Sequence, residues 1–184
     1  IIGPCSAHEQ KPVLEYVERL GRLSDRVKDK LVLVPRIYTN KPRTRGVGYK
    51  GMFSQPDPNK SEDILKGIYA IRELNIKAIE ASGLAAADEM LYPANIHYVD
   101  DLLSYIAVGA RSCENQLHRL VASGIDVPVG IKNPMSGSIL TLINSIYASQ
   151  SAQVFKLNGW QVETDGNPLS HAILRGAVDS YGND

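Results

Sequence analysis

The sequence predicts an α/β fold in which strands and helices alternate along the chain. Short β-rich apolar runs alternate about five times with segments whose apolar residues recur at helical spacing. The 184 residues suit one domain with a substantial core, and neither a shift in composition nor an internal repeat divides them. Such alternation is typical of a parallel sheet whose strands are connected by crossover helices.

Composition narrows the class of protein further. Hydrophobic residues make up 43% of the chain, which is too many for a disordered protein, and two cysteines are too few for a disulfide scaffold. The 20 Lys and Arg balance the 20 Asp and Glu, so the net charge predicts neither a nucleic acid nor an anionic membrane as partner. No apolar run approaches the roughly 18 residues of a membrane span, and no signal peptide opens the chain. We therefore expect a soluble, cytoplasmic domain of the size of an enzyme.

Periodicity and capping residues predict the elements of the first half. Apolar residues recur at three- and four-residue steps over residues 11–30, where Pro12 suits the first turn of a helix. Ser61 can cap a second helix, and Gly83 fits its end. The apolar face expected for this second helix consists of Leu65, Ile68, Ile76 and Ile79. Strands are expected at residues 1–4, 31–34 and 84–87.

The second half continues the alternation and then changes character. Helices are expected at residues 95–103, 117–123 and 138–149, and strands at 105–108, 127–131 and 172–174. Before the last strand, residues 154–155 are a further β-rich pair, and Asp165-Gly166 is a turn signal. Either an open doubly wound sheet or a (β/α) barrel fits this order. A full eight-stranded barrel takes about 250 residues, so six strand candidates would be three-quarters of one.

Charged residues follow the apolar runs at the carboxyl ends of the expected strands. The cations are Arg36, Arg111, Lys132 and Arg175, and Cys5 and Glu89 follow two other strands. Parallel strands end on one face, where ligands bind, so these side chains are expected to gather around one site. Four cations repel one another unless an anion neutralises them, and guanidinium groups suit carboxylate and phosphate. We therefore predict an anionic ligand; charges that merely cover the surface are the alternative.

Six short sequence motifs follow one another along essentially the whole chain. They are Gly3-Pro4-Cys5-Ser6-Ala7-His8, Lys41-Pro42-Arg43-Thr44, Gly109-Ala110-Arg111, Ala122-Ser123-Gly124, Gly130-Ile131-Lys132-Asn133 and Ile173-Leu174-Arg175-Gly176. Together they resemble type I 3-deoxy-D-arabino-heptulosonate 7-phosphate (DAHP) synthases. The resemblance implies a (β/α)8 TIM barrel, truncated here after about six strands, with residues 1–184 as a single, incomplete catalytic domain. It also implies a transferase that condenses phosphoenolpyruvate with erythrose 4-phosphate to DAHP and phosphate, the first step of aromatic amino-acid biosynthesis by the shikimate pathway.

The resemblance implies roles for individual residues. Those expected to bind phosphoenolpyruvate are Arg36, Lys41, Glu89, Gly109, Ala110, Arg111, Lys132 and Arg175. Arg43 and Thr44 are expected to bind erythrose 4-phosphate, and Lys41 and Arg36 to act in catalysis. Cys5 is expected to be a ligand of a divalent metal cation, for which Mn, Fe, Co and Zn are the candidates. The metal would polarise the aldehyde as a Lewis acid.

The family completes its metal site with a His, a Glu and an Asp from its last two strands, and none of the four histidines here occupies such a position. We therefore expect that more chain exists, and that the 184-residue piece alone does not turn over. We also expect homo-oligomers. One alternative is the sister 3-deoxy-manno-octulosonate 8-phosphate synthase, whose usual K-x-N-R-[ST] loop differs from Lys41-Pro42-Arg43-Thr44. The other is a non-catalytic barrel remnant that binds phosphorylated anions.

Overall fold

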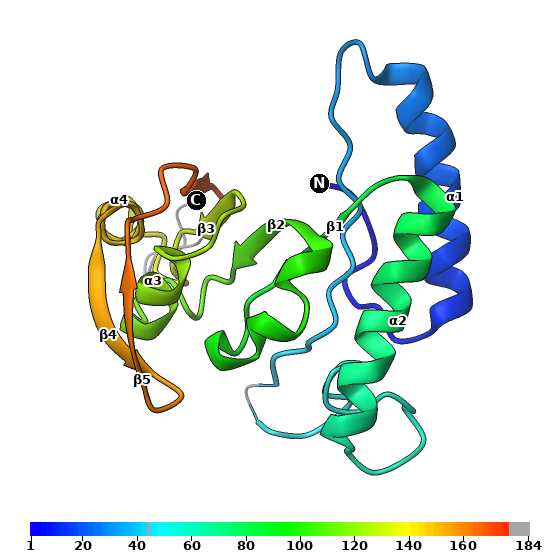
Figure 1. Cartoon of the computed structure of the whole chain (residues 1–184), viewed down its shortest axis with the longest axis horizontal. Helices are drawn as coiled ribbons and strands as arrows, with labels where there is room; N and C mark the ends of the chain where they lie inside the picture. The colour runs from blue at the N-terminus through cyan, green and yellow to red at the C-terminus, as the bar shows by residue number, and fades with distance from the viewer. Residues whose placement is uncertain (44, 177–184) are drawn as a thin grey trace. The chain divides into compact units, whose positions relative to one another are not determined.

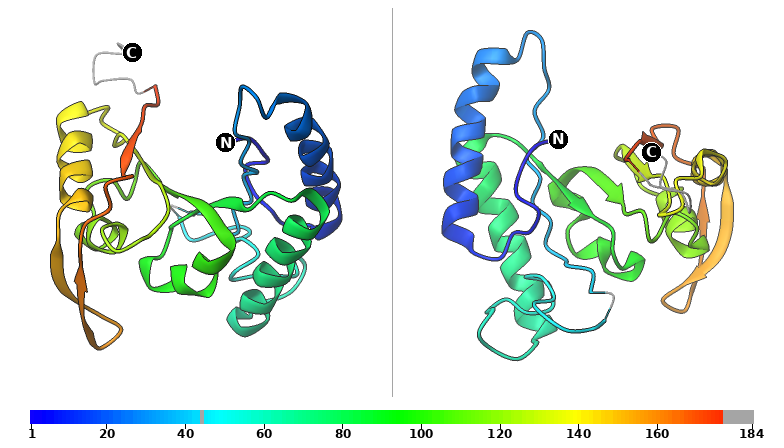
Figure 2. Two further views of the ribbon diagram at one scale, coloured as in Figure 1. Left: turned by 45° about the horizontal axis from the view of Figure 1, so that its top comes forward. Right: turned by 180° about the vertical axis from the view of Figure 1, so that it is seen from behind.

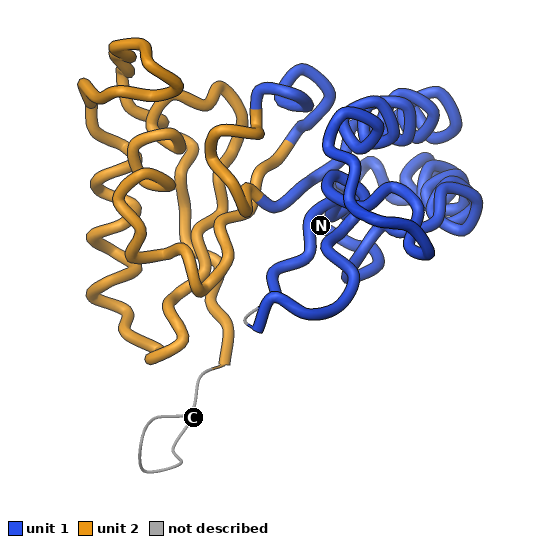
Figure 3. Tube along the Cα trace, turned by 90° about the horizontal axis from the view of Figure 1, so that it is seen from below, with its two compact units in different colours: residues 1–89, 97–104 blue, residues 90–96, 105–184 orange. Residues whose placement is uncertain are grey.

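The chain contains two compact units, each with its own secondary structure (Figure 3). The computed structural model describes residues 1–43 and 45–176 (Figure 1). Unit 1 comprises residues 1–89 and 97–104, and unit 2 comprises residues 90–96 and the described residues from 105 onward. None of the described helices combines the length and the apolar character that crossing a bilayer requires.

Two long helices of unit 1, α1 (Gln10–Val27) and α2 (Ile64–Ser82), lie side by side (Figure 1). The apolar periodicity predicted α1 correctly, and Val13, Val17 and Leu20 are buried on one of its faces. The helices approach closely at Gly21, where a Cβ would come within 2.7 Å of the Ser82 carbonyl oxygen. A glycine at this point of α1 therefore allows the two helices to pack.

The sequence predicted the end of α2 at Gly83 correctly, but it did not predict the residue that caps the start of the helix. Gly83 adopts the left-handed conformation with φ +69° and donates its N–H to the Ile79 carbonyl. The cap is Asp63, not Ser61, because the Asp63 carboxylate accepts the Lys66 N–H at 3.1 Å.

The apolar face predicted for α2 is wrong. Leu65 is 65% exposed, and the buried positions of the helix are Gly67, Ile71, Leu74, Asn75 and Ala78. A Cβ at Gly67 would collide with the Phe53 carbonyl oxygen. The inward face therefore combines the apolar side chains Ile71, Leu74 and Ala78 with a small residue where close backbone approach requires one.

Parallel pairing in unit 1 begins later than the predicted strand at residues 31–34. Val32 is 89% exposed, and the bridges instead join Ile2 to Pro35 and Arg36 to Ala87, the latter in β1 (Ala86–Glu89). Residues 35–37 thus run between the N-terminal segment and β1, parallel to both. This arrangement brings the carboxyl ends of these segments to the same edge.

Unit 2 contains a parallel sheet in the order β2-β3-β6. Its strands are β2 (Leu103–Val108, which begins in unit 1), β3 (Val129–Lys132) and β6 (His171–Ile173). Helix α3 (Gln116–Ala122) follows β2, and α4 (Ile139–Gln150) follows β3, as predicted. The structure confirms a mixed α/β fold with a parallel sheet, and the strands within the described ranges do not close into a barrel.

Two further segments differ from the prediction. The helix expected at 95–103 is a pair of 3-10 helices, η1 (Pro93–Tyr98) and η2 (Asp100–Leu102). The Asp100 carboxylate accepts the Asp101 N–H at 2.9 Å, a local bond that competes with a regular helix. The β-rich pair at 154–155 belongs to an antiparallel hairpin of β4 (Gln153–Leu157) and β5 (Trp160–Thr164), which follows α4 (Figure 2).

The turn between β4 and β5 is Asn158-Gly159, and the turn signal Asp165-Gly166 directly follows β5, where Gly166 has φ +86°. Asn158 and Gly159 have φ values of +51° and +88°, as a type I′ turn requires. The Asn-Gly dipeptide is a strong sequence signal for such a turn, so this hairpin was predictable. It interrupts the alternation of parallel strands and helices before β6.

Candidate functional site

Unit 1 brings together four of the residues predicted for the site, namely Cys5, Arg36, Lys41 and Glu89. The Lys41 ammonium donates to the Cys5 Sγ at 2.9 Å, and this bond lowers the pKa of the Cys5 thiol. The charge of Arg36 lowers the same pKa further, and the charge of Glu89 raises it. The two cations, the carboxylate and the thiol therefore influence one another at one edge of unit 1.

Arg36 fixes the N-terminal segment that carries Cys5. Its Nη2 and Nε donate to the carbonyl oxygens of Gly3 and Pro4 at 2.6 and 3.0 Å, and the guanidinium lies 5.3 Å from the Tyr38 ring centroid. A Cβ at Gly3 would collide with the Arg36 carbonyl oxygen, so the segment can approach Arg36 only with a glycine here.

The loop that carries Lys41 folds back on its own backbone. The Lys41 N–H donates to the Lys50 carbonyl at 3.0 Å, and the Arg43 Nε donates to the Tyr49 carbonyl at 2.7 Å. Gly51 has φ +97°, and a Cβ there would come within 2.5 Å of the Thr39 carbonyl oxygen. These contacts fix the Lys41 backbone, whereas Thr44 lies outside the described residues.

A buried carboxylate, that of Asp88, lies next to Glu89 in β1. Asp88 is 2% exposed and accepts three hydrogen bonds, from the Thr39 N–H, the Thr39 hydroxyl and the Glu89 N–H. Burial raises the pKa of Asp88 to about 7, against the lowering effect of these bonds. The sequence analysis missed Asp88, although an acidic residue directly after the apolar run Leu84–Ala87 was a visible signal.

In unit 2, three predicted cations follow the carboxyl ends of three neighbouring parallel strands. Lys132 ends β3, Arg111 follows β2 after Gly109-Ala110, and Arg175 follows β6. The register pairs Val108 with Ile131 and Lys132 with Ile173, so all three strands end at one edge of the sheet.

A buried amide links two of these strand ends. Asn133, which follows Lys132, is 2% exposed. Its Nδ2 donates to the Arg175 carbonyl at 3.0 Å, and its Oδ1 accepts the Arg175 N–H at 2.8 Å. The two bonds fix the backbone of Arg175 beside the end of β3. The sequence motifs included Asn133 beside Lys132 but indicated no role for it.

The described residues do not fit a complete divalent-metal site. Within residues 1–43 and 45–176, no three His, Cys, Asp or Glu side chains lie close enough together to hold an ion. Cys5 is the one predicted ligand in this range. The rings of His118 and His171 hydrogen-bond to other protein groups, and His8 and His97 lie exposed beside carboxylates.

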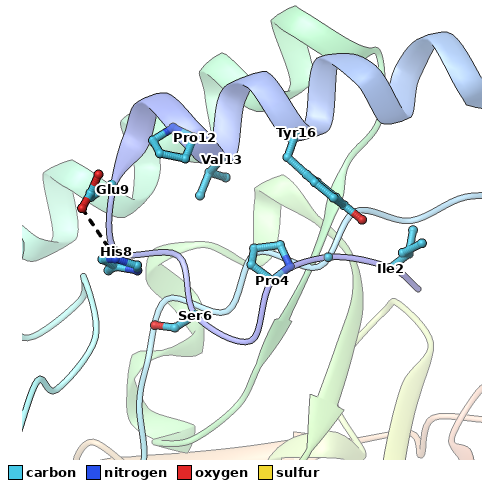
Figure 4. A pocket seen from close by; sticks show the side chains of 9 residues that line it. Ile2, Pro4, Ser6, His8, Glu9, Pro12, Val13 and Tyr16 are labelled. Carbon is cyan, nitrogen blue, oxygen red and sulfur yellow. Dashed lines mark ion pairs between the residues drawn. The ribbon is translucent and has the colours of Figure 1, made fainter.

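A largely apolar cavity of about 480 Å³ lies elsewhere in unit 1, between the N-terminal segment and the start of α1 (Figure 4). Ile2, Pro4, Val13 and Tyr16 line it, and the His8–Glu9 ion pair lies at one end. No Lys or Arg is among its lining residues. This cavity is therefore not the site predicted for an anion.

Comparison with known proteins assigns the chain to a family. The sequence model of the DAHP synthetase I family matches residues 1–183. The chain belongs to this family. The resemblance predicted from the short motifs is thus confirmed.

Named relatives are similar over nearly the whole chain. The "Phospho-2-dehydro-3-deoxyheptonate aldolase, Trp-sensitive" of Enterobacter agglomerans is 43% identical over 181 residues, which cover 96% of this chain and 51% of the relative. The Tyr-sensitive aldolase of Escherichia coli K12 is 41% identical over 186 residues, covering 96% of this chain and 50% of the relative. The aldolase of Corynebacterium glutamicum is 35% identical over 189 residues, covering 100% and 51%.

A solved structure of a family member has a similar fold. The phospho-2-dehydro-3-deoxyheptonate aldolase of Francisella tularensis SCHU S4 matches with a TM-score of 0.89 and 31% identity, over 96% of this chain and 53% of that one. The chain thus spans about half the length of the relatives that it matches.

Proposed function

We propose that this member of the DAHP synthetase I family is an enzyme that condenses phosphoenolpyruvate with erythrose 4-phosphate to DAHP and phosphate. The observation that carries the proposal is the row of Arg111, Lys132 and Arg175 at the carboxyl ends of three neighbouring parallel strands. A row of cations at this edge suits an anion that carries both a phosphate and a carboxylate. The names of the relatives support the same reaction.

The proposal includes the fold of the whole domain. We propose that residues 1–184 are part of a single catalytic domain with a (β/α)8 TIM barrel. The parallel order β2-β3-β6 with intervening helices supports it, as does the match to the Francisella structure. Assembly into homo-oligomers and a cytoplasmic location stay predictions of the sequence.

The cations of unit 2 would bind phosphoenolpyruvate and hold it for reaction. Its enol carbon C3 attacks the aldehyde carbon of erythrose 4-phosphate and forms the new C–C bond. Water then adds at C2, and the C–O bond to phosphate breaks, so that phosphate leaves with the bonding electrons. Arg111, Lys132 and Arg175 neutralise the phosphate and carboxylate charges, and Gly109-Ala110 allows close approach of the backbone.

The residues of unit 1 would act at the aldehyde. Lys41 stabilises negative charge or supplies a proton at the reacting oxygen, while Arg36 and Glu89 help to hold phosphoenolpyruvate. Arg43 and Thr44 bind the phosphate of the aldehyde substrate. Cys5 is proposed as one ligand of a divalent metal, and the described residues do not form its complete site.

A binding experiment tests this function. Replacing Arg111 by Ala is expected to weaken phosphoenolpyruvate binding about 100-fold or more, because the substrate charge loses its partner. Isothermal titration measures the dissociation constant, and Arg22→Ala on α1, which removes an exposed ion pair, is the matched control. An unchanged dissociation constant in the Arg111 variant would contradict the proposal.

A turnover experiment distinguishes the alternatives. The full-length protein is expected to release phosphate from phosphoenolpyruvate only when erythrose 4-phosphate and a divalent metal are present, whereas residues 1–184 alone are expected not to turn over. Binding of phosphoenolpyruvate without phosphate release would support an anion-binding remnant. Release with a different aldose phosphate, but not with erythrose 4-phosphate, would support the sister synthase.

A further inference from the structure

The parallel ladder between residues 35–37 and β1 ends at a side chain. The Ala87 N–H donates to the Pro35 carbonyl at 2.8 Å, and the Ile37 N–H donates to the Ala87 carbonyl at 2.9 Å. If the ladder continued, its next two donors would be the N–H groups of Glu89 and Thr39.

Both of these N–H groups donate instead to the carboxylate of Asp88. Its Oδ1 accepts the Glu89 N–H at 2.7 Å and the Thr39 N–H at 3.0 Å. Its Oδ2 accepts the Thr39 hydroxyl at 2.5 Å. One buried carboxylate therefore replaces the strand ladder at the point where the two segments reach the site.

The groups that this carboxylate fixes are directly connected to site residues. Thr39 precedes Lys41 by two positions, and Glu89 is the next residue after Asp88. The Thr39 carbonyl accepts the Phe53 N–H at 3.1 Å, so Thr39 is held from both sides. A change in the hydrogen bonds of Asp88 is therefore expected to shift the backbone that carries Lys41 and Glu89.

We propose that Asp88 and Thr39 are positioning residues that fix Lys41 and Glu89 for catalysis, and that the protonation state of Asp88 sets how firmly they do so. The inference rests on the proposed function and deepens it, because neither residue is among those that the family resemblance assigns. As a carboxylate, Asp88 accepts all three bonds with a full charge. When protonated, it donates its O–H to the Thr39 hydroxyl and keeps the two N–H bonds only as a neutral acceptor.

The charges near Asp88 are consistent with a change between these forms at neutral pH. Burial disfavours the ionised form most strongly, and the charge of Glu89 on the same strand acts in the same direction. On the neighbouring segment, the cations Arg36 and Lys41 direct their side chains to other partners, the N-terminal carbonyls and Cys5. The buried face of α2, which packs against β1, consists of Gly67, Ile71, Leu74, Asn75 and Ala78, none of them ionisable.

Steady-state kinetics of the full-length protein test the inference through variants of Thr39 and of Asp88. Thr39→Val is expected to lower kcat/KM at least about 10-fold at high pH, because it leaves a buried carboxylate oxygen without a partner. Thr39→Ser keeps the hydroxyl and is expected to stay within about 3-fold of the wild type. Thr141→Val in α4, which also loses a hydroxyl bond, is the matched control for the substitution itself.

The decisive measurement is the ratio of kcat/KM between the wild type and Asp88→Asn across pH. The ratio removes the titration of the substrates, which is common to both proteins. It is expected to stay near one below about pH 6, where Asp88 is neutral, and to rise several-fold above about pH 8, where only the wild type has a charged acceptor.

The outcomes separate the inference from the proposed function. A ratio that does not change with pH, in a wild type that turns over, overturns the role of Asp88 alone. A full-length wild type that neither binds phosphoenolpyruvate nor turns over overturns the proposed function itself. If Thr39→Val fails to fold, as near-ultraviolet circular dichroism would show, the pH dependence of Asp88→Asn still decides the question.

Discussion

In both units a buried polar side chain holds the backbone of candidate site residues. In unit 1 that side chain is a carboxylate, and in unit 2 it is an amide. In unit 1 a buried carboxylate, Asp88, takes backbone N–H groups where a strand ladder ends. In unit 2 a buried amide, Asn133, makes a reciprocal pair of bonds with the backbone of Arg175. Both residues are 2% exposed, so neither side chain can replace its protein hydrogen bonds by bonds to water. Of these two side chains only the carboxylate can change charge, so pH is expected to act on the contacts of Asp88 and not on those of Asn133.

The charges at the two edges differ in a related way. Unit 1 combines Arg36 and Lys41 with Glu89 and a thiol of lowered pKa, a mixed set suited to moving charge and protons. Unit 2 presents Arg111, Lys132 and Arg175, a set suited to holding an anion. Under the proposed function, the loss of a unit 2 cation is therefore expected to act mainly on anion binding.

The largest expected effect concerns stability and pH. Asp88 has a pKa of about 7 in the folded chain and 3.8 as its ordinary value, so the folded state keeps its proton to higher pH. The stability that this proton gives is fully present below about pH 4 and is lost as pH rises to about 7. The free energy of unfolding of the wild type relative to Asp88→Asn should therefore fall by up to about 4 kcal/mol over this range. Urea unfolding at a series of pH values measures it, and a constant difference would contradict the contrast between the units.

A smaller effect is expected when the amide of unit 2 is removed. Asn133→Ala leaves the N–H and carbonyl of Arg175 without their buried partners, which should cost about 2 kcal/mol of stability. Phosphoenolpyruvate should also bind about 10-fold more weakly, because Arg175 is less firmly held. Unlike the effects at Asp88, these losses should be the same at about pH 6 and about pH 8. Titration calorimetry at both values checks this, and a loss confined to one pH would refute it.

The smallest effect is expected when the buried amide of unit 2 is replaced by a carboxyl group, as unit 1 has. Asn133→Asp keeps an oxygen to accept the Arg175 N–H but, when ionised, places a second oxygen against the Arg175 carbonyl. The variant should lose about 1–2 kcal/mol at neutral pH and recover part of it in acid, where the protonated carboxyl can donate. Thermal unfolding of this variant beside Asn133→Ala measures the difference. Identical pH profiles of the two variants would show that the carboxyl gains no partner.

Much of the fold followed from local signals in the sequence. The periodicity of residues 11–30 predicted α1, and Gly83 predicted the end of α2, because both depend on neighbours within one or two turns. The hairpin turn at Asn158-Gly159 was also encoded locally but was overlooked. The inward face of α2 was predicted wrongly, although Ile71, Leu74 and Ala78 recur on it at helical spacing. The close backbone approach at Gly67 is the part that no local pattern shows.

The sequence by itself determined the α/β class, the family and the identity of the charged residues that follow the strands. Only the tertiary structure decided which buried groups hold those residues, since Asp88 meets a partner 49 positions away and Asn133 one 42 positions away. The register of parallel segments creates these contacts, and burial then shifts the pKa of Asp88 to about 7. Neither register nor desolvation is a property of neighbouring residues in the chain, so no local pattern could have indicated them.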